Sequence, residues 1–259
     1  MSPDVPRTVT STPPSVVELR QYTVIPGRRD FLAELFLREF LDPQEAVGAR
    51  IAGPFYDLEK PDRFVWLRAF SDLASRPSVL ASFYASPAWK THRDAVNGVL
   101  IDSNNVLLLR PVRDDPDSSP GQEWLGEPGP PSVLLGAIFS FKSAPTQAFF
   151  EFFELHVQPA LAETLATRPV GLETESASNN YPNLPVREGD HFFVWLAWHS
   201  NRSALEKTAA VLEHGGLPPP LQAELDSWLR GPPECLRLVP ARRFVLPGAS
   251  SAPFSGYRS

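Results

Sequence analysis

A short phrase that occurs twice constrains the fold of this chain more than any other feature. The segment DRFVWLRAF at residues 62–70 returns in altered form as DHFFVWLAWH at residues 190–199. Both copies read as strands, and they lie about half a chain length apart. Internal repetition of this kind indicates that a whole structural unit is repeated. The sequence therefore predicts two related domains.

Segments rich in proline, glycine and serine mark the borders of these domains. Residues 113–131 (RDDPDSSPGQEWLGEPGPP) have the composition of an exposed linker. Residues 1–15 and 247–259 are poor in helix and strand formers, and we predict that they are disordered tails. Two blocks remain, residues 16–112 and 132–246, and a chain of 259 residues has room for two domains of this size.

Both blocks have the same predicted order of elements, β-α-β-β-α-β. In the first block, VVELRQYTVI, ARIAGPFYDL, RFVWLRAF and NVLLLRPV read as strands, with helices after the first and the third. The second block repeats this order from VLLGAIFSF to CLRLVPARRFVL. Its first helix contains Pro159, which is expected to kink or split that helix.

One such unit forms a four-stranded antiparallel sheet with its helices on one face, the ferredoxin-like arrangement. The other face of the sheet is left bare, and an aromatic sheet face of this kind has to be covered. Two units in tandem can cover each other. We therefore predict an α+β fold in which two ferredoxin-like units pack sheet to sheet as a dimeric α+β barrel within one chain. The molecule is expected to be a monomeric pseudo-dimer or a homodimer.

Composition and motifs argue against several classes of function. The formal net charge is −6 and no run of lysine or arginine occurs, so no nucleic-acid partner is predicted. No apolar stretch approaches the length of a membrane helix, and residues 1–15 lack the apolar core of a secretion signal, so we expect a cytoplasmic protein with no membrane partner. The single cysteine, the spacing of the histidines and the lack of phosphate-binding glycine motifs predict neither a metal site nor a cofactor.

Several stretches resemble the NIPSNAP family, within the dimeric α+β-barrel superfamily. They are ELRQYTVIPGRRDFL, DRFVWLRAF, FYASPAWKTHRDA and NVLLLRP in the first block and YPNLPVREGDHFFVW in the second. The resemblance covers nearly the whole chain outside the tails and the linker, and it implies the barrel fold. Related barrels include cofactor-free oxygenases, isomerases, haem-handling enzymes and small-molecule binders, so the fold does not decide the function.

A first candidate site lies on the opening strand, where Glu18, Arg20 and Tyr22 alternate with Val17, Leu19 and Gln21. On the third strand, Trp66 and Arg68 alternate with an aliphatic set. Because side chains of a strand alternate between its two faces, we expect the aliphatic set to face the helices and the charged set to face the barrel interior. The first and third strands are neighbours in a ferredoxin-like sheet, so Arg20 and Arg68 should lie close together.

The second block lacks these charges. When its first helix is aligned on Phe149 opposite Phe31, the residues opposite the charged set of the opening strand are Gly136, Ile138 and Ser140; Ala197 lies opposite Arg68. One half thus presents charge and the other presents small or apolar side chains. This asymmetry predicts a cavity for an amphipathic ligand with an anionic or carbonyl end near the arginines. The alternative is that Glu18 pairs with an arginine in a satisfied, purely structural bridge.

A second candidate site is the helical segment that carries Tyr84, Trp89 and His92. Trp89 and His92 are three residues apart and share a helix face, so an imidazole would stand beside an aromatic wall. In the alternative interpretation, Trp89 anchors the helix and His92 is solvated. If the protein is an enzyme, the candidate catalytic groups are His92, Tyr22 and Glu18.

Three functions remain open from the sequence. The first is the binding of a small amphipathic or aromatic molecule in the barrel interior. The second is a cofactor-independent enzyme, of monooxygenase or isomerase type, that acts on an aromatic or polyketide-like substrate. The third is a scaffolding or interaction protein. A general acid or base inside the cavity would separate the second from the first.

Overall fold

The computed structural model of the chain describes residues 14–112, 125, 129 and 131–241. The predicted tail 247–259 lies outside the described residues. So do residues 1–13 of the first predicted tail and most of the predicted linker 113–131.

The first unit has the predicted order of elements, with each helical segment split into two helices. Its elements are β1 (Val16–Val24), α1 (Arg29–Glu39), α2 (Leu41–Ala46), β2 (Arg50–Asp57), β3 (Arg63–Phe70), α3 (Arg76–Ala85), α4 (Pro87–Asn97) and β4 (Leu100–Pro111). The break between α3 and α4 falls at Ser86, which has an extended backbone and caps α4 by accepting a hydrogen bond from the Trp89 amide. Pro87 then provides a first helical residue that needs no hydrogen-bond acceptor.

The second unit repeats this order. Its elements are β5 (Val133–Ser140), α5 (Gln147–Phe152), the π-helical η1 (Phe153–Val157), α6 (Gln158–Leu161), the 3₁₀-helical η2 (Ala162–Thr164), β6 (Val170–Thr174), β7 (Phe192–His199), α7 (Arg202–His214), α8 (Pro219–Trp228) and β8 (Glu234–Pro240). The prediction at Pro159 is confirmed, because a π-helical turn precedes it and divides the helix. Proline has no amide hydrogen to donate, so the regular α-helical ladder cannot continue through it.

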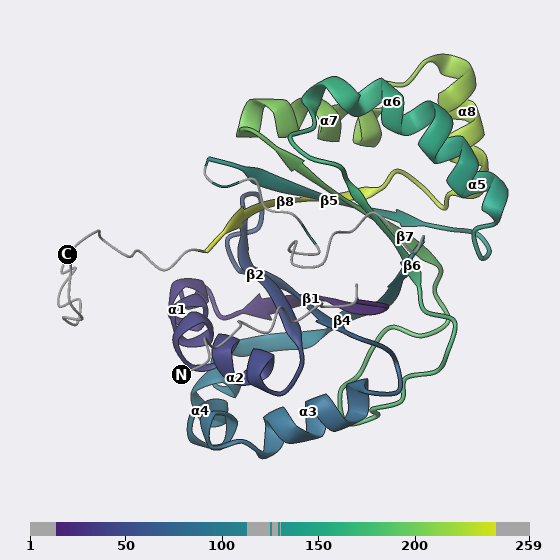
Figure 1. Cartoon of the computed structure of the whole chain (residues 1–259). Coiled ribbons are helices and arrows are strands. Elements are labelled where there is room, and N and C mark those ends of the chain that lie inside the picture. Colours follow the sequence, from purple (N-terminus) through teal and green to yellow (C-terminus); the bar gives the residue numbers. More distant parts are fainter. Residues whose placement is uncertain (1–13, 113–124, 126–128, 130, 242–259) are drawn as a thin grey trace, which may run out of the picture.

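The eight strands form one closed barrel in the order β1-β3-β2-β8-β5-β7-β6-β4. Within it each unit contributes an antiparallel sheet of ferredoxin-like order, β4-β1-β3-β2 and β6-β7-β5-β8. The two sheets join through β2 with β8 and through β4 with β6. The helices cover the outside, α1–α4 on the first sheet and α5–α8 on the second (Figure 1). The predicted barrel of two tandem ferredoxin-like units is confirmed.

Aliphatic side chains from both units fill the barrel interior. They are buried and form one cluster that includes Val17, Leu19, Val65, Leu67, Ala69, Leu107, Leu109, Leu134, Leu172, Val194, Leu196, Leu236 and Leu238. The prediction that the aliphatic residues of β3 face the helices is therefore wrong. Both faces of each sheet are buried, so alternation separates two sets of residues without assigning either set to a face. The aliphatic set fills the space between the sheets, and the aromatic and charged set lies under the helices.

The two units differ in what lies between sheet and helices. In the second unit this layer is a phenylalanine-rich cluster that contains Phe139, Phe149, Phe153, Phe193 and Trp195. In the first unit it contains aromatic rings and, beside them, buried charged side chains. The layer under the helices of the first unit thus contains the larger group of buried charges.

His199 is a buried titratable group in the helix-facing layer of the second unit. Its Nδ1 lies 3.0 Å from the Ala197 carbonyl oxygen and its Nε2 lies 2.9 Å from Oγ1 of Thr208. Burial lowers the pKa of His199 from 6.5 to about 4, so the ring is neutral in the folded state at neutral pH. Alignment of the repeated FVW segment places Phe70 of the first unit at the matching position.

We therefore expect the free energy of unfolding to fall between pH 6.5 and pH 4. Because the folded pKa is below the unfolded one, the neutral ring stabilises the fold fully above pH 6.5, and this contribution is lost as the pH falls toward 4. His199→Phe, which installs the residue of the first unit, should lack this part of the pH dependence. Urea unfolding of both proteins at intervals across this range measures it; equal pH slopes would contradict the assignment.

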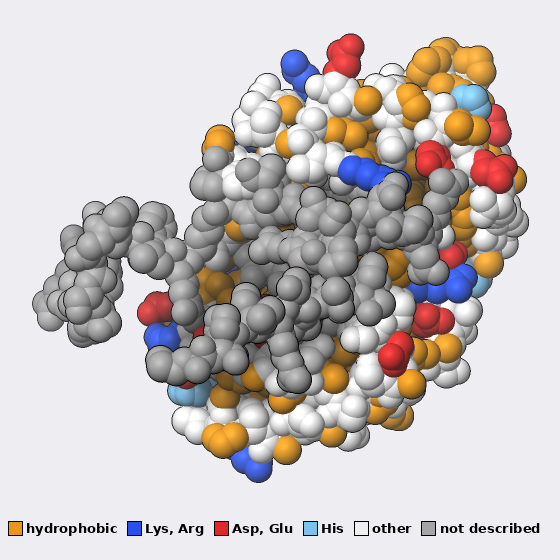
Figure 2. All heavy atoms as spheres, viewed as in Figure 1, with side chains coloured by type: hydrophobic (Ala, Val, Ile, Leu, Met, Phe, Trp, Pro, Cys, Tyr) orange, Lys and Arg blue, Asp and Glu red, His pale blue; other side chains and the backbone are white. Residues whose placement is uncertain are grey.

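The surface carries charges of both signs. On the face drawn in Figure 2, the described acidic and basic side chains lie scattered rather than gathered into one patch. Within the described ranges, every helix is too short or too polar to cross a membrane.

Candidate functional site

Three arginines surround one glutamate on the helix-facing side of the first unit. We call Glu18, Arg20, Arg68 and Arg76 the arginine cluster; their exposed fractions are 0%, 2%, 1% and 0%. Arg20 Nη1 donates to Glu18 Oε2 at 2.7 Å, and Arg68 donates to the same oxygen from Nε at 3.0 Å and from Nη2 at 2.7 Å. Arg76 Nε donates to Oε1 at 2.8 Å, with Nη2 2.7 Å from that oxygen. Both carboxylate oxygens are thus occupied.

Strand register and one helix start bring these side chains together. Glu18 on β1 lies directly opposite Arg68 on β3, and Arg20 lies opposite Trp66. Arg76 is the first residue of α3 and reaches down onto the sheet. The expected proximity of Arg20 and Arg68 is confirmed, since both bind the same oxygen of Glu18.

The expected direction of these side chains is wrong. The sequence predicted that they point into the barrel interior, but Arg68 contacts Gln44 of α2 and Glu18 contacts Arg76 of α3. The cluster therefore lies between the sheet and the helices of the first unit. The reason is the same as for β3, because the aliphatic residues occupy the barrel interior.

The cluster carries more positive than negative charge. Arginine stays protonated at any pH a protein survives, and no second carboxylate among the described residues pairs with these three. Burial alone would raise the pKa of Glu18, but the charges of Arg68, Arg20 and Arg76 outweigh it and hold the pKa well below its usual range. With one carboxylate and three guanidinium groups, the cluster has two positive charges in excess.

The other partners of the arginines are neutral. Arg20 Nε donates to the Tyr22 hydroxyl at 2.8 Å, and Arg68 Nη1 donates to Gln44 Oε1 at 3.1 Å. Burial raises the pKa of Tyr22 despite the nearby Arg20, so this phenol stays protonated at neutral pH. Arg76 Nη1 donates to Oδ1 of Asn179 at 3.0 Å and of Asn180 at 2.9 Å. None of these acceptors compensates the excess charge.

Aromatic rings line one side of the cluster. The guanidinium carbons of Arg20 and Arg68 lie 5.5 and 5.1 Å from the centre of the Trp66 ring. Tyr22 meets Trp66 edge to face at 6.1 Å. Trp66 is 4% exposed, yet its Nε1 has no acceptor among the described residues. The layer therefore combines cationic groups, aromatic faces and two buried donors without a hydrogen-bond acceptor among the described residues, Trp66 Nε1 and Arg76 Nη2.

A loop from the second unit closes this layer. Residues 175–191, between β6 and β7, run beside α3 of the first unit (Figure 1). Asn180 Nδ2 donates to the Leu73 carbonyl at 2.6 Å, and the ring of Tyr181 stacks on Tyr84 at 6.5 Å. The arginine cluster is thus built by the first unit and covered by the second.

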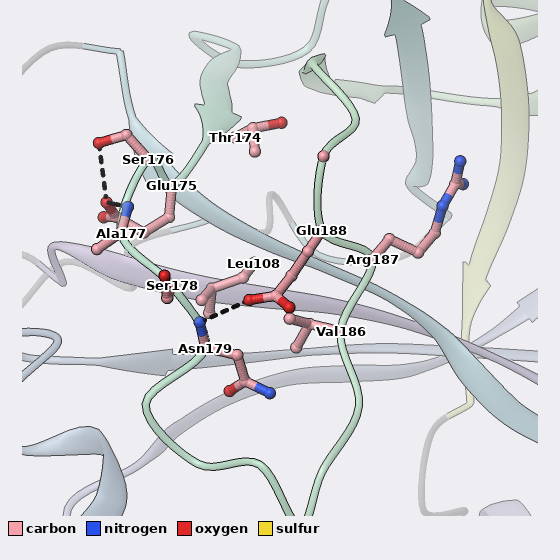
Figure 3. A pocket seen from close by; sticks show the side chains of 11 residues that line it. Leu108, Thr174, Glu175, Ser176, Ala177, Ser178, Asn179, Val186, Arg187 and Glu188 are labelled. Carbon is pink, nitrogen blue, oxygen red and sulfur yellow. Dashed lines mark hydrogen bonds between the residues drawn. The ribbon is translucent and has the colours of Figure 1, made fainter.

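A pocket of about 340 Å³ lies between the two arms of this loop (Figure 3). Its lining consists of Leu108 on β4, Thr174 and the loop residues Glu175–Asn179 and Val186–Gly189. Asn179 belongs both to this lining and to the hydrogen bonds of Arg76. One asparagine side chain therefore connects the pocket with the arginine cluster.

The structure brings five of the predicted site residues together, namely Glu18, Arg20, Tyr22, Trp66 and Arg68. Tyr84 and Trp89 lie beyond them in the aromatic layer, with their rings edge to face at 4.9 Å. His92 is 28% exposed on its side chain, and its Nε2 lies 3.3 Å from Glu39 Oε2. It therefore points to the surface rather than into the cluster.

The sequence did not predict one member of the cluster, Arg76. It also did not predict three residues that bind the cluster, namely Gln44, Asn179 and Asn180. Arg76 stands beside a proline at a helix start, and Asn179 and Asn180 lie in a loop more than a hundred positions along the chain. No periodic pattern marks such residues. Glu18 is also a poor candidate for a general base, since its low pKa and occupied oxygens leave it no affinity for a proton.

The strand pairs correct the comparison of the two units by one residue. Phe64 and Phe193 match in the repeated phrase, and they pair with Tyr22 and Phe139. The residues that match Glu18, Arg20 and Tyr22 are therefore Leu135, Ala137 and Phe139, rather than Gly136, Ile138 and Ser140. Ala197 does match Arg68. The asymmetry persists, since none of the matching residues is charged.

Among the residues that the structure describes, no three histidine, cysteine or acidic side chains gather in a way that would hold a metal ion.

Comparison with solved structures supports the barrel fold. A candidate monooxygenase from Fusobacterium nucleatum aligns with a TM-score of 0.56 at 7% identity, over 88% of this chain and 93% of that one. An anthrone oxidase-like protein aligns with a TM-score of 0.52 at 14% identity, over 87% and 91%. A search of curated proteins finds no match. At these identities the likeness shows the fold alone.

Shorter proteins match one unit. A NIPSNAP-like domain protein from Burkholderia xenovorans is 30% identical over 42% of this chain and 94% of its own, with a TM-score of 0.36. The family model NIPSNAP matches residues 17–116, which include every strand and helix of the first unit except the first residue of β1. Residues 17–116 of the chain are therefore a domain of the NIPSNAP family.

Proposed function

We propose that the protein binds a small aromatic or amphipathic molecule with an anionic end, and that the anion contacts the arginine cluster of the first unit. The observation that supports this proposal is the buried excess of two positive charges. Burying an uncompensated charge is costly, so a structural bridge would be expected to balance its charges. A bound anion would supply the missing negative charge.

The hydrogen-bond geometry leaves the arginines able to accept such a partner. Arg20 uses Nε for Tyr22 and Nη1 for Glu18. Arg76 Nη2 lies 2.7 Å from Glu18 Oε1 without the geometry of a hydrogen bond, so this buried donor has no hydrogen-bond acceptor among the described residues. Arg76 Nη1 is bound only by neutral amide oxygens. A hydrogen bond between a charged group and an anion contributes about 1.5–3 kcal/mol net, more than a neutral one.

The aromatic layer supports an aromatic body for the ligand. The rings of Tyr22, Trp66 and Tyr84 belong to the apolar cluster beside the arginines. Buried donors in proteins are almost always paired, so the unpaired Nε1 of Trp66 favours a ligand that brings its own acceptor. The pocket beyond Asn179 offers the route by which such a ligand approaches.

Isothermal titration calorimetry of the full chain tests this proposal. We expect 2-naphthoate to bind and its neutral counterpart, 2-naphthalenemethanol, to bind at least about tenfold more weakly, because only the first carries the charge. Arg20→Met should weaken naphthoate binding about tenfold or more, since the loss of one charge-assisted contact of 1.5–3 kcal/mol corresponds to that factor.

Arg237→Met is the matched control. Arg237 is also a buried arginine, but it lies in the second unit, where it binds Glu206 and Glu213. Its loss should leave the naphthoate affinity unchanged. Equal binding of the acid and the alcohol, or equal effects of the two arginine substitutions, would refute the proposal.

A second candidate function is a cofactor-independent enzyme acting on an aromatic or polyketide-like substrate. The observation that favours it is the Tyr22 hydroxyl, a buried phenol held by Arg20 beside aromatic rings. Such a group can donate a proton to a substrate oxygen while the arginine stabilises the resulting charge. Oxygen uptake with anthrone, which dioxygen converts to anthraquinone and water, tests it. Turnover that Tyr22→Phe abolishes would support an enzyme; no turnover above the uncatalysed rate would contradict one.

A further inference from the structure

We infer that the side-chain oxygens of Asn179 and Asn180, which accept hydrogen bonds from Arg76, lie where the carboxylate of a ligand binds. The inference rests on the proposed function and specifies the anion, the residue that anchors it and the side chains that the ligand displaces.

Arg76 has the surroundings of a carboxylate-binding arginine, but the oxygens bound to its Nη1 belong to neutral amides. Its Nε and Nη2 face Glu18 Oε1 at 2.8 and 2.7 Å. Its Nη1 meets two oxygen atoms, Oδ1 of Asn179 at 3.0 Å and Oδ1 of Asn180 at 2.9 Å. A carboxylate also presents two oxygens, but it carries the negative charge that the two amides lack.

The position of Arg76 in its helix makes these neutral acceptors unusual. Arg76 is the first residue of α3, where the helix dipole disfavours a cation, and its exposed fraction is 0%. Glu18 is shared with Arg20 and Arg68, so it does not compensate Arg76 by itself. An arginine with a purely structural role at this place would be expected to have its own carboxylate.

Each asparagine side chain also donates a hydrogen bond to one backbone carbonyl. Asn179 Nδ2 donates to the Leu184 carbonyl within its own loop, and Asn180 Nδ2 donates to the Leu73 carbonyl. In Figure 3 Asn179 lies at the pocket, with its backbone amide donating to Glu188. Displacement of the Asn179 side chain would therefore open the pocket directly onto Arg76.

Asn180→Asp tests this inference in the full chain, because it places a carboxylate of nearly identical shape on Arg76. We expect its affinity for 2-naphthoate to fall at least tenfold, since the anion position is then filled from within the chain. Because the aspartate also loses the hydrogen bond that Asn180 Nδ2 donates to the Leu73 carbonyl, the melting temperature does not report on the anion position. Arg76→Met in the Asn180→Asp background should lower the affinity little further, because both substitutions remove the same anion position. Arg76→Met alone should also weaken naphthoate binding.

Asn201→Asp is the matched control. Asn201 is exposed and caps α7 by accepting from the Ala204 amide, a position that aspartate fills equally well. It changes the net charge by the same amount and should leave the naphthoate affinity unchanged.

The outcomes separate this inference from the proposed function. If Asn180→Asp leaves the naphthoate affinity unchanged while Arg20→Met still weakens binding, the inference is wrong and the proposed function stands. If the unmodified chain does not bind 2-naphthoate at all, the proposed function fails and the inference fails with it.

Discussion

Replacing Glu18 with glutamine is expected to destabilise the protein more than replacing any one of the three arginines around it. The substitution leaves three buried guanidinium groups without a carboxylate, and breaking a buried ion pair in this way costs about 3–5 kcal/mol. Arg20→Met, Arg68→Met or Arg76→Met leaves Glu18 with two cationic partners and lowers the excess charge, so each should cost less. If instead Glu18 were paired with a single arginine, replacing that arginine would lower the free energy of unfolding more than Glu18→Gln does.

Urea unfolding of the four variants at neutral pH measures this order. The pH dependence provides a further check. Because the folded pKa of Glu18 lies below its ordinary value, its contribution is fully present above about pH 4.3 and is lost as the pH falls further. Glu18→Gln should therefore lack part of the acid destabilisation of the unmodified chain. A Glu18→Gln variant as stable as Arg20→Met would show that the carboxylate does not hold the cluster together.

The first unit, residues 14–112, is expected not to form a folded monomer when it is produced alone. Its inner sheet face, with Leu19, Leu67 and Leu107, packs against side chains of the second unit and against Leu125 between the units. Each such side chain contributes about 1.5–3 kcal/mol when it is buried, and all of them would be exposed together. The exposed face would exceed the apolar patch that soluble monomers tolerate.

Size-exclusion chromatography with light scattering, followed by thermal melting, tests this prediction. We expect a dimer that buries the same face against a second copy, or aggregation. The full chain, purified in parallel, is the control. A soluble monomer that melts cooperatively would contradict the account of the barrel.

The repeated phrase was enough to predict the barrel. The alternation along each strand was not enough to predict which strand face lies inside the barrel and which lies under the helices. Alternation correctly grouped Glu18, Arg20 and Arg68 on one face and Leu19 and Leu67 on the other. In a barrel covered by helices, both faces of the sheet are buried, so hydrophobicity does not distinguish the interior from the helix side. The sizes of the side chains and the geometry of two facing sheets decide that question.

The one-residue error in matching the two units has a local cause. The alignment paired Phe31 with Phe149, but Phe31 is 40% exposed and Phe149 is fully buried. Six residues separate Tyr22 from the start of α1, and seven separate the matching Phe139 from the start of α5. Strand register is a safer guide than a shared phenylalanine in a helix.

The partners of the cluster could not be predicted because they come from distant segments. Arg76 lies 58 positions from Glu18, and Asn180 lies 104 positions from Arg76. Glu18, Arg20 and Arg68 are visible in the sequence because charges interrupt apolar strands. An asparagine in a long loop carries no such signal, and only the folded chain places it on an arginine.

A crystal structure of the full chain grown with 4-bromobenzoate tests the central claim most directly, because the anomalous scattering of bromine locates the ligand without ambiguity. The proposed function predicts bromine in the helix-facing layer of the first unit, with the carboxylate within hydrogen-bond distance of Arg20 or Arg76. Bromine found only in the second unit or on the surface, with Arg76 still bound to Asn179 and Asn180, would contradict it.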